Sequence, residues 1–297
     1  MNDEKYLQVI KKIFPAISEE QIEVFDDGWD FVVFLVNKKM TFRFPRRKYY
    51  ADKLPAEVDF ITKFKKLSPV PIPNLKLHAD KTLKFPYVTY PFISGVQFKK
   101  ELAGTFSQEE LLTIAKQLAY FLSALHSFPL EKIKALRKYG LEGLKAWQNR
   151  LKKIKQKVFP FISTSEQQWI EKIFNNFFAV MKKSNIKLCV THSDIMPEHI
   201  IVDPHKHTLS GIIDFGDISI GDPALDFTFL NKYGKDFLDK VYDEYKLITD
   251  EYFETRRQFY EDRLVVTNLE HVIGLKDKKK ILIHKKQLSD YVVVHHF

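Results

Sequence analysis

Polar side chains gather between apolar runs in one stretch of the sequence. Asp194 and His199 stand five residues apart, just before the apolar run 200–202, and Asp214 follows the apolar pair Ile212-Ile213. Gly216 comes two residues later, where it permits a sharp turn. We expect the apolar runs to form strands and the polar residues to lie on neighbouring loops, where their side chains converge.

These residue types suit the transfer of a phosphoryl group. The transferred phosphate carries spread negative charge, so metal ions and fixed cations must hold it. Asp214 offers a hard oxygen ligand suited to Mg²⁺, and His199 could complete the metal site. Asp194 could accept the proton of an attacking hydroxyl or orient it, and positioned bases typically contribute ~10²–10⁴-fold to a rate.

The first part of the chain has the pattern of a small sheet with one main helix. Residues 31–36 and 40–44 predict a strand pair joined by a turn at 37–39, and Pro45 should end the second strand. Apolar spacing predicts a helix over 55–67, which prolines then break. Residues 87–93 look extended, and we expect the boundary between two lobes just after them.

Long helices dominate the rest of the sequence. Ser107 and Glu110 form a capping-box pattern before a helix that reaches His126. Further helices are expected over 141–157, 165–181 and from 223 to about 286, with a β-rich stretch at 188–213. The predicted class is α+β, with a small antiparallel N-terminal lobe (1–93) and a larger, mainly helical C-terminal lobe (94–297).

Composition excludes several classes of protein. With 297 residues, 45% hydrophobic and 29% charged, the chain can bury a substantial core and is not a disordered tail. The N-terminus lacks the apolar core of a signal peptide, and the early apolar run 31–36 is far shorter than the ~18 residues of a membrane helix. We therefore expect a cytoplasmic location and no membrane partner. The single cysteine, Cys189, excludes an internal disulfide.

The net charge of +9 is unevenly distributed. No glycine-and-aromatic signature of nucleic-acid binding accompanies it, so we expect no nucleic-acid partner. Residues 222–270 hold 12 acidic residues against 7 basic ones, a balance of −5. This stretch could attract a cationic substrate, or it could consist of ordinary solvated helix faces.

The order and spacing of the polar motifs resemble those of a known family. His192-x-Asp194-x4-His199 with Asp214-Phe-Gly resembles the kinase catalytic loop and metal motif. The pattern is more similar to the aminoglycoside phosphotransferase family, above all to its 2″-phosphotransferases, which carry histidine where protein kinases carry asparagine. The likeness includes 42–45, 118–127, Asp222-Pro223 and Asp226-Phe227, and it spans about 28–230.

The resemblance implies a two-lobed protein-kinase-like fold and transfer of the γ-phosphate of ATP or GTP. It implies that Asp194 is the catalytic base and that His199 and Asp214 hold Mg²⁺. Glu57 would pair with the cation of the phosphate-binding strand, which here is Arg43 where lysine is usual. Arginine keeps the charge and can grip a carboxylate or phosphate with two donors.

Four further residues would bind the nucleotide by the same resemblance. Gly28 is the only glycine of residues 26–30, where it allows a close backbone approach or simply forms a hairpin turn. The Pro91 carbonyl would accept from the purine edge, since proline has no backbone donor, and the Ile93 N–H would donate to it. Ser193, which precedes the expected catalytic base Asp194, is also expected to bind the nucleotide.

The resemblance points to an aminoglycoside, a cationic small molecule, as the leading acceptor. However, the 2″-type relatives have a dense acidic run where residues 228–235 of this chain hold no acid. Asp236, Asp239, Asp243 or Glu244 could take over the binding of the cation, and Asp217 could contact metal or substrate. Macrolides, sugars and other hydroxyl compounds stay open as acceptors.

Two other functions are weighed against this interpretation. A protein kinase is disfavoured, because only seven residues separate Asp214 from Asp222 and leave no long activation segment. A non-catalytic nucleotide-binding module would explain Arg43, although Asp194, His199 and Glu57 all accompany it. We expect the protein to act as a monomer.

Overall fold

The computed structural model describes residues 3–26, 28–139, 143–247 and 249–295. These residues form two compact units, each described here by itself. One comprises Met1–Tyr139, Cys189–Ile220 and Leu230–Leu247, and the other comprises Gly140–Leu188, Gly221–Phe229 and Ile248–Phe297. Neither unit begins or ends at residue 93, so the lobe boundary expected there stays a prediction.

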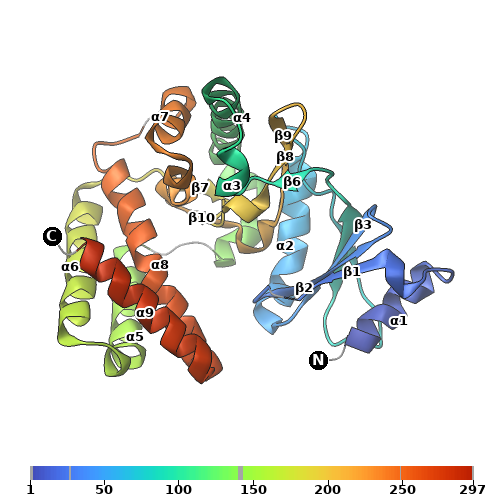
Figure 1. Ribbon diagram of the computed structural model, residues 1–297, viewed down its shortest axis with the longest axis horizontal. Helices are drawn as coiled ribbons and strands as arrows, with labels where there is room; N and C mark the ends of the chain where they lie inside the picture. The colour runs from blue at the N-terminus through green and yellow to red at the C-terminus, as the bar shows by residue number, and fades with distance from the viewer. Residues whose placement is uncertain (1–2, 27, 140–142, 248, 296–297) are drawn as a thin grey trace. The chain divides into compact units, whose positions relative to one another are not determined.

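The order of the elements follows the predicted change from sheet to helices (Figure 1). The strands are β1 (Ile22–Phe25), β2 (Phe31–Val36), β3 (Met40–Pro45), β4 (Lys76–His78), β5 (Tyr87–Pro91), β6 (Val96–Gln97), β7 (Cys189–Thr191), β8 (Ile200–Asp203), β9 (Thr208–Ile212) and β10 (Ser219–Gly221). The α-helices are α1 (Asp3–Ile13), α2 (Lys48–Phe64), α3 (Lys100–Ala103), α4 (Gln108–His126), α5 (Leu144–Lys157), α6 (Thr164–Lys183), α7 (Lys235–Glu244), α8 (Phe253–Leu275) and α9 (Lys278–His295). Residues 141–142, where the prediction began α5, lie outside the described residues.

The first unit is built on an antiparallel five-stranded sheet of order β1-β2-β3-β5-β4. The predicted pair β2–β3 is confirmed, with Val36 opposite Met40. Asn37 and Lys38 both have positive φ, at 53° and 52°, as the tight turn of a twisted hairpin requires. Pro45 is the last residue of β3, as expected of a residue without a backbone donor.

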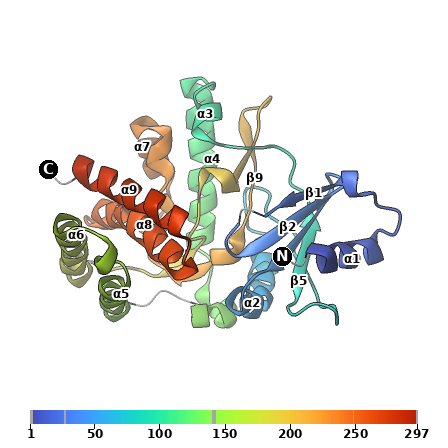
Figure 2. The ribbon, with the colours of Figure 1, turned by 60° about the horizontal axis from the view of Figure 1, so that its bottom comes forward.

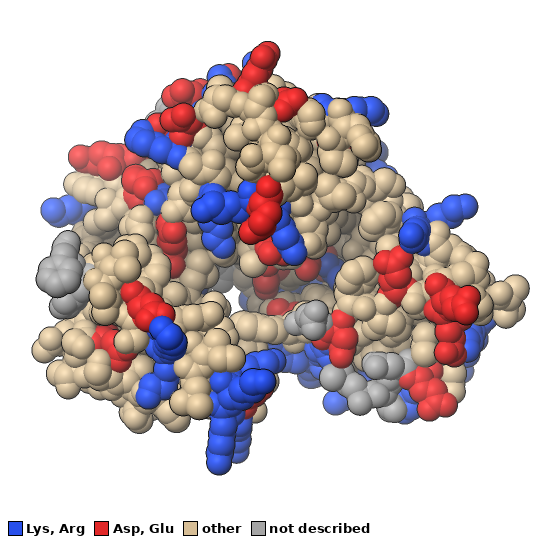
Figure 3. Space-filling view, viewed as in Figure 1, with Lys and Arg blue, Asp and Glu red and all other residues tan. Residues whose placement is uncertain are grey.

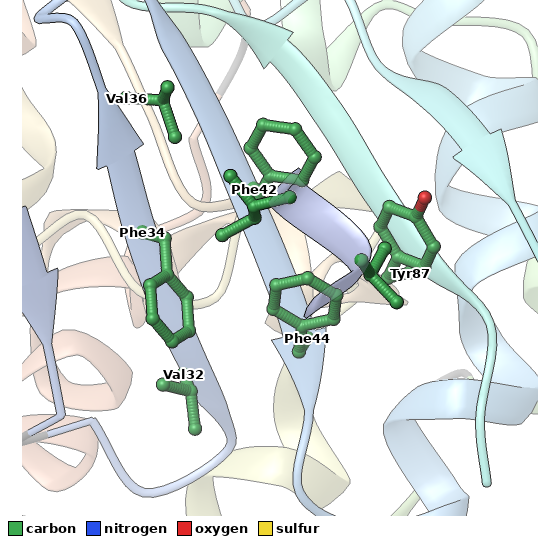
Figure 4. Close-up of a cluster of buried hydrophobic side chains, with 8 residues drawn as sticks. Val32, Phe34, Val36, Phe42, Phe44 and Tyr87 are labelled. Atoms are coloured by element: carbon green, nitrogen blue, oxygen red, sulfur yellow. The ribbon is translucent and has the colours of Figure 1, made fainter. Parts of the chain in front are cut away.

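One face of this sheet forms an aromatic core (Figure 4). Alternate residues of β2 and β3 point to the same side, so Phe34, Phe42 and Phe44 meet there. The helix α1 lies along this face in both ribbon views and contributes Val9 and Ile10 (Figures 1 and 2). The core fixes the register of β3 and so the side of the sheet on which Arg43 lies, because a shift of one residue would reverse every side chain.

The helix α2 begins two turns earlier than predicted. We expected Pro55 to open it, but it starts at Lys48 and contains Pro55 in its interior. Ala51 and Leu54, which precede the proline, are buried. Burial of this apolar face outweighs the preference of proline for the first turn. The correction matters because these added turns carry Tyr50 and Lys53.

The remaining strands of the first unit carry the polar loops. Strands β6, β8 and β9 form one small antiparallel sheet, and β7 pairs with β10 in another. The predicted capping box of α4 is confirmed, since the Glu110 N–H donates to Ser107 Oγ and the Ser107 N–H donates to the Glu110 carboxylate at 2.7 Å. Helix α4 packs against β7, β9 and α7. The loops at the ends of β7 and β9 are thereby held on a rigid base.

The second unit is a helical assembly of α5, α6, α8 and α9. Its core is aromatic, with the Phe177 and Phe259 rings stacked 3.8 Å apart and Trp147 at their edge. Asp222 accepts from the Ala224 N–H and from Arg256 Nε at 2.6 Å, so this carboxylate has a structural role. No helix within the described residues combines the length and the apolar character needed to cross a membrane.

Several acidic side chains of the acidic stretch 222–270 form ion pairs with basic residues of the same stretch. Asp250 pairs with Arg256, and Glu254 and Glu261 pair with Arg257. On the face viewed in Figure 3, acidic and basic side chains are interspersed over most of the surface, with a basic group near the N-terminal end of α9. The structure therefore favours the interpretation of this stretch as solvated, internally paired helix faces.

Candidate active site

The loop between β7 and β8 places Asp194 and His199. Ser193 adopts a left-handed conformation with φ of 71°, and a 3₁₀ turn over Pro197–His199 leads into β8. The hydroxyls of Thr191, Ser193 and Ser219 lie within 2.9–3.1 Å of one another and tie this loop to β10. Backbone strain of this kind persists only where the surroundings enforce it, which is common at functional sites.

The turn after β9 places Asp214. This residue is also left-handed, with φ of 61° and ψ of 71°, and its Oδ1 accepts from the Gly216 N–H at 3.2 Å. A Cβ on Gly216 would lie 2.9 Å from a ring atom of Phe31, so a larger residue would displace the turn. The glycine is therefore needed for close packing, and not for backbone freedom as predicted, because the left-handed residue of this turn is Asp214.

The two loops bring Asp194, His199 and Asp214 together. His199 Nδ1 lies 3.3 Å from the Asp194 carboxylate, and His199 Nε2 lies 3.7 Å from Asp214 Oδ2. Burial alone would lower the pKa of His199, but the carboxylates of Asp214 and Asp194 outweigh it and raise the pKa. The same contact with His199, together with Arg43, lowers the pKa of Asp214 against the effect of burial.

The donor set at His199 and Asp214 fits a divalent cation. His199 Nδ1 donates to the backbone carbonyl of Asp194 at 2.9 Å, which leaves the lone pair of a neutral imidazole on Nε2. Asp214 Oδ1 is held by Arg43 and Gly216, which leaves Oδ2 facing that nitrogen. Among the described residues, no group of three or more His, Cys, Asp or Glu side chains could hold a metal. Mg²⁺ would therefore take its other ligands from phosphates and water, as it usually does.

Arg43 on β3 links the Asp214 carboxylate to α2. Its guanidinium donates to Glu57 at 2.5 Å and to Asp214 Oδ1 at 3.1 Å, and it lies 4.3 Å from the centre of the Phe31 ring. Arg43 and Glu57 are both almost fully buried. Burial would lower the pKa of Arg43, but the two carboxylates outweigh it and raise the pKa. The forked side chain reaches both carboxylates at once, which the single ammonium of a lysine would do less well.

We expect Arg43→Met to destabilise the protein by roughly 3–5 kcal/mol, because it strands the buried Glu57 carboxylate without its partner. Urea denaturation followed by circular dichroism measures the change. The double variant Arg43→Met/Glu57→Leu is the control, since it removes both buried charges and should recover most of the stability. Equal losses in the single and double variants would contradict the pairing.

The remaining predicted nucleotide residues lie in the first unit. Gly28 precedes β2, where an added Cβ would lie 3.1 Å from the Phe31 carbonyl. Pro91 ends β5 opposite Met40, and the Phe92 N–H donates to the Lys39 carbonyl. The Ile93 side chain packs on Gly211, close to where an added Cβ would lie. These positions leave the nucleotide roles of Gly28, Pro91, Ile93 and Ser193 as predictions.

The predicted acceptor residues on α7 are engaged with neighbouring side chains. Asp236 accepts from Gln108 Nε2 at 3.1 Å and lines a pocket of about 240 Å³. The pocket is lined by Gln108, Leu111, Tyr233, Gly234, Lys235, Asp236 and Phe237. Asp239 pairs with Lys235, and Glu244 pairs with Lys240. Basic partners therefore offset the charge of Asp239 and Glu244, whereas Asp236 is bonded to a neutral amide.

Asp217 contacts α2, which the sequence analysis did not anticipate. Its Oδ1 accepts from the Tyr50 hydroxyl at 3.2 Å, and the buried Lys53 lies on the same face of α2. Tyr50, Lys53 and Glu57 have the spacing i, i+3, i+7 of one helix face. This signal is present in the sequence, but placing the helix start at Pro55 concealed it.

Most of the chain is similar in sequence to known phosphotransferases. The sequence profile described as the phosphotransferase enzyme family matches residues 21–259. The viomycin phosphotransferase of Streptomyces vinaceus is 22% identical over 245 residues, which cover 80% of this chain and 82% of that protein.

Solved structures share the fold. The GDP complex of wild-type aminoglycoside 2′-phosphotransferase-IIIa has a TM-score of 0.86 at 24% identity, covering 98% of each chain. The macrolide 2′-phosphotransferase apoenzyme from Brachybacterium faecium has a TM-score of 0.69 at 14% identity, covering 96% of this chain and 98% of that one. These matches confirm the predicted α+β fold with its antiparallel N-terminal sheet and helical C-terminal region.

Proposed function

Because the chain belongs to the phosphotransferase enzyme family, we propose that it transfers the γ-phosphate of ATP or GTP to a hydroxyl group of a small molecule. The observation that carries this proposal is the convergence of Asp194, His199 and Asp214 from two loops. An acid–base carboxylate beside a two-donor cation site is the arrangement that phosphoryl transfer requires.

Each side chain has a separate part in the proposed reaction. The Asp194 carboxylate, which is partly exposed, orients the acceptor hydroxyl and takes its proton as the oxygen attacks the γ-phosphorus. His199 Nε2 and Asp214 Oδ2 would hold Mg²⁺. The bound metal supplies positive charge against the phosphate oxygens. Arg43 keeps Asp214 in place through its bond to Oδ1 and adds further positive charge to the site.

We propose that the nucleotide lies against β1–β3 and the segment after β5. Gly28 would allow the backbone to approach the phosphates, and Ser193 would lie beside them. The Pro91 carbonyl and the Ile93 N–H would pair with the purine edge. The GDP complex of the aminoglycoside relative supports a guanine nucleotide as one donor, and ATP is the other candidate.

An aminoglycoside is the first acceptor to test, in line with the names of the structural relatives. A different hydroxyl compound is the second candidate. It is favoured by the pairing of Asp239 with Lys235 and of Glu244 with Lys240, which offsets two of the four carboxylates of α7. The relatives named for viomycin and macrolides supply the next compounds for the test.

A substrate panel decides between these acceptors. Purified protein is incubated with Mg²⁺ and either ATP or GTP, and phosphate transfer to kanamycin, viomycin, a macrolide and simple sugars is followed by mass spectrometry. We expect a mass gain of one phosphate on at least one compound and none with an Asp194→Asn control. Transfer only to a non-aminoglycoside would overturn the acceptor assignment but not the chemistry. Nucleotide binding without transfer to any compound and without slow hydrolysis would favour a non-catalytic binding module.

A further inference from the structure

Lys53 is a buried cation whose role the proposed reaction does not explain. Its side chain is on α2, and the residue is only 2% exposed. Within the described part of the chain no carboxylate comes within ion-pairing distance of its ammonium, and its recorded contacts are with the rings of Tyr49 and Tyr139, at 6.0 and 5.7 Å. Burying an ammonium without a direct partner is costly, so nearby negative charge must compensate for it.

That negative charge comes from the end of the Asp214 turn. Burial lowers the pKa of Lys53, and Asp217 is the strongest of the neighbouring carboxylates that oppose this shift, followed by Glu57. Conversely, burial raises the pKa of Asp217, and Lys53 is the main group that opposes that rise. Lys53 follows Tyr50 by three residues on α2, so the two lie on one face of the helix, and α2 packs against the turn Phe215–Asp217.

Tyr50 joins the same turn to α2 by a hydrogen bond. Its hydroxyl donates to Asp217 Oδ1 at 3.2 Å, and its ring packs edge-on against Phe31, at 5.4 Å between centroids. Phe31 in turn lies against Gly216 and under the Arg43 guanidinium. Tyr50 is therefore held in place from two sides and can fix the position of the Asp217 carboxylate.

Helix α2 thus holds the turn at two separated points. Glu57 reaches Asp214 through Arg43, and Tyr50 reaches Asp217 directly. The seven residues from Tyr50 to Glu57 span about 10 Å of helix. Two attachments at this separation fix the orientation of the turn as well as its position.

We propose that Lys53 and Tyr50 are positioning residues that anchor Asp217 to α2 and thereby hold the Asp214 turn in the conformation that binds Mg²⁺ with the nucleotide. Asp214 has a left-handed backbone. Its carboxylate and that of Asp217 repel each other, because both belong to one short turn. Lys53 offsets the charge of Asp217, and the Asp214 carboxylate then stays directed to Arg43 and His199. The inference rests on the proposed function and gives Asp217 a positioning role in place of the metal or substrate contact that its sequence position left open.

The test uses the full chain and two readouts. Binding of a fluorescent ATP or GTP analogue is titrated with Mg²⁺, and amide hydrogen exchange of residues 214–218 is measured in the free protein. For Lys53→Met we expect the Mg²⁺ concentration at half-maximal binding to rise about 10- to 100-fold, the usual effect of removing a group that orients a metal ligand. Exchange of the Gly216 and Ile218 amides, which donate to Asp214 Oδ1 and the Phe215 carbonyl, should become faster.

Matched variants separate positioning from general stability. Lys53→Arg keeps the charge and should restore most of the Mg²⁺ affinity. Tyr50→Phe removes only one hydroxyl and should weaken Mg²⁺ binding in the same direction, which covers the case that Lys53→Met does not fold. Lys48→Met changes a largely exposed lysine of the same helix that pairs with Asp52, and it should have no effect.

Wild-type Mg²⁺ dependence and wild-type exchange in both Lys53→Met and Tyr50→Phe would overturn the inference. So would a general loss of stability with unchanged exchange at residues 214–218. If the wild-type protein binds no Mg-nucleotide at all, the proposed function fails, and the exchange measurement still decides whether Lys53 and Tyr50 hold the turn.

Discussion

Asp194→Asn should reduce phosphate transfer by roughly 10²–10⁴-fold while leaving the binding of Mg-nucleotide close to that of the wild type. The substitution keeps the shape of the side chain but removes the negative charge that accepts the proton of the acceptor hydroxyl. The carboxylate contacts His199 on one side and is partly exposed on the other, so it is accessible to an acceptor. The nucleotide is held by other groups and should not respond.

Single-turnover transfer and nucleotide titration measure the two effects separately. The expected pattern is a fall in kcat with little change in the KM for nucleotide, because the interaction lost is one made in the transition state. A variant that turned over at the wild-type rate but bound Mg-nucleotide more weakly would assign Asp194 to the metal instead of the acceptor.

Asp214→Asn should instead damage metal-dependent nucleotide binding and, with it, transfer. Its Oδ2 faces His199 Nε2, and its Oδ1 accepts from Arg43 and Gly216. An amide in place of the carboxylate removes the charge that attracts Mg²⁺. A metal supplies several kcal/mol of charge stabilisation, so we expect a loss of roughly 10²-fold or more.

Calorimetric titration of ATP or GTP with and without Mg²⁺ measures this loss. The control is Asp203→Asn, which changes the aspartate that ends β8 and accepts from the His205 and Lys206 N–H groups. The control should bind Mg-nucleotide as the wild type does. Metal-independent binding of equal strength in the wild type and Asp214→Asn would remove Asp214 from the cation site.

Much of the local structure could be predicted from sequence because neighbouring residues encode it. The apolar run of β2, the turn at Asn37-Lys38 and the capping box of α4 each depend on residues a few positions apart. The helix α2 was placed too late, because Pro55 is a strong local signal that the burial of Ala51 and Leu54 overrides. Local rules cannot weigh a buried face that only the rest of the fold supplies.

The sequence by itself determined which residues are candidates for catalysis, since Asp194 and His199 are close in the chain and Asp214 follows a recognisable strand end. Only the tertiary structure decided which distant side chains contact this part of the chain. Arg43 lies 171 residues from Asp214, and Tyr50 lies 167 residues from Asp217. Contacts at such separations depend on how α2 packs against the turn after β9, so no short-range pattern contains them. The same reason explains why Lys53 is evident as a possible functional group only after its burial is seen.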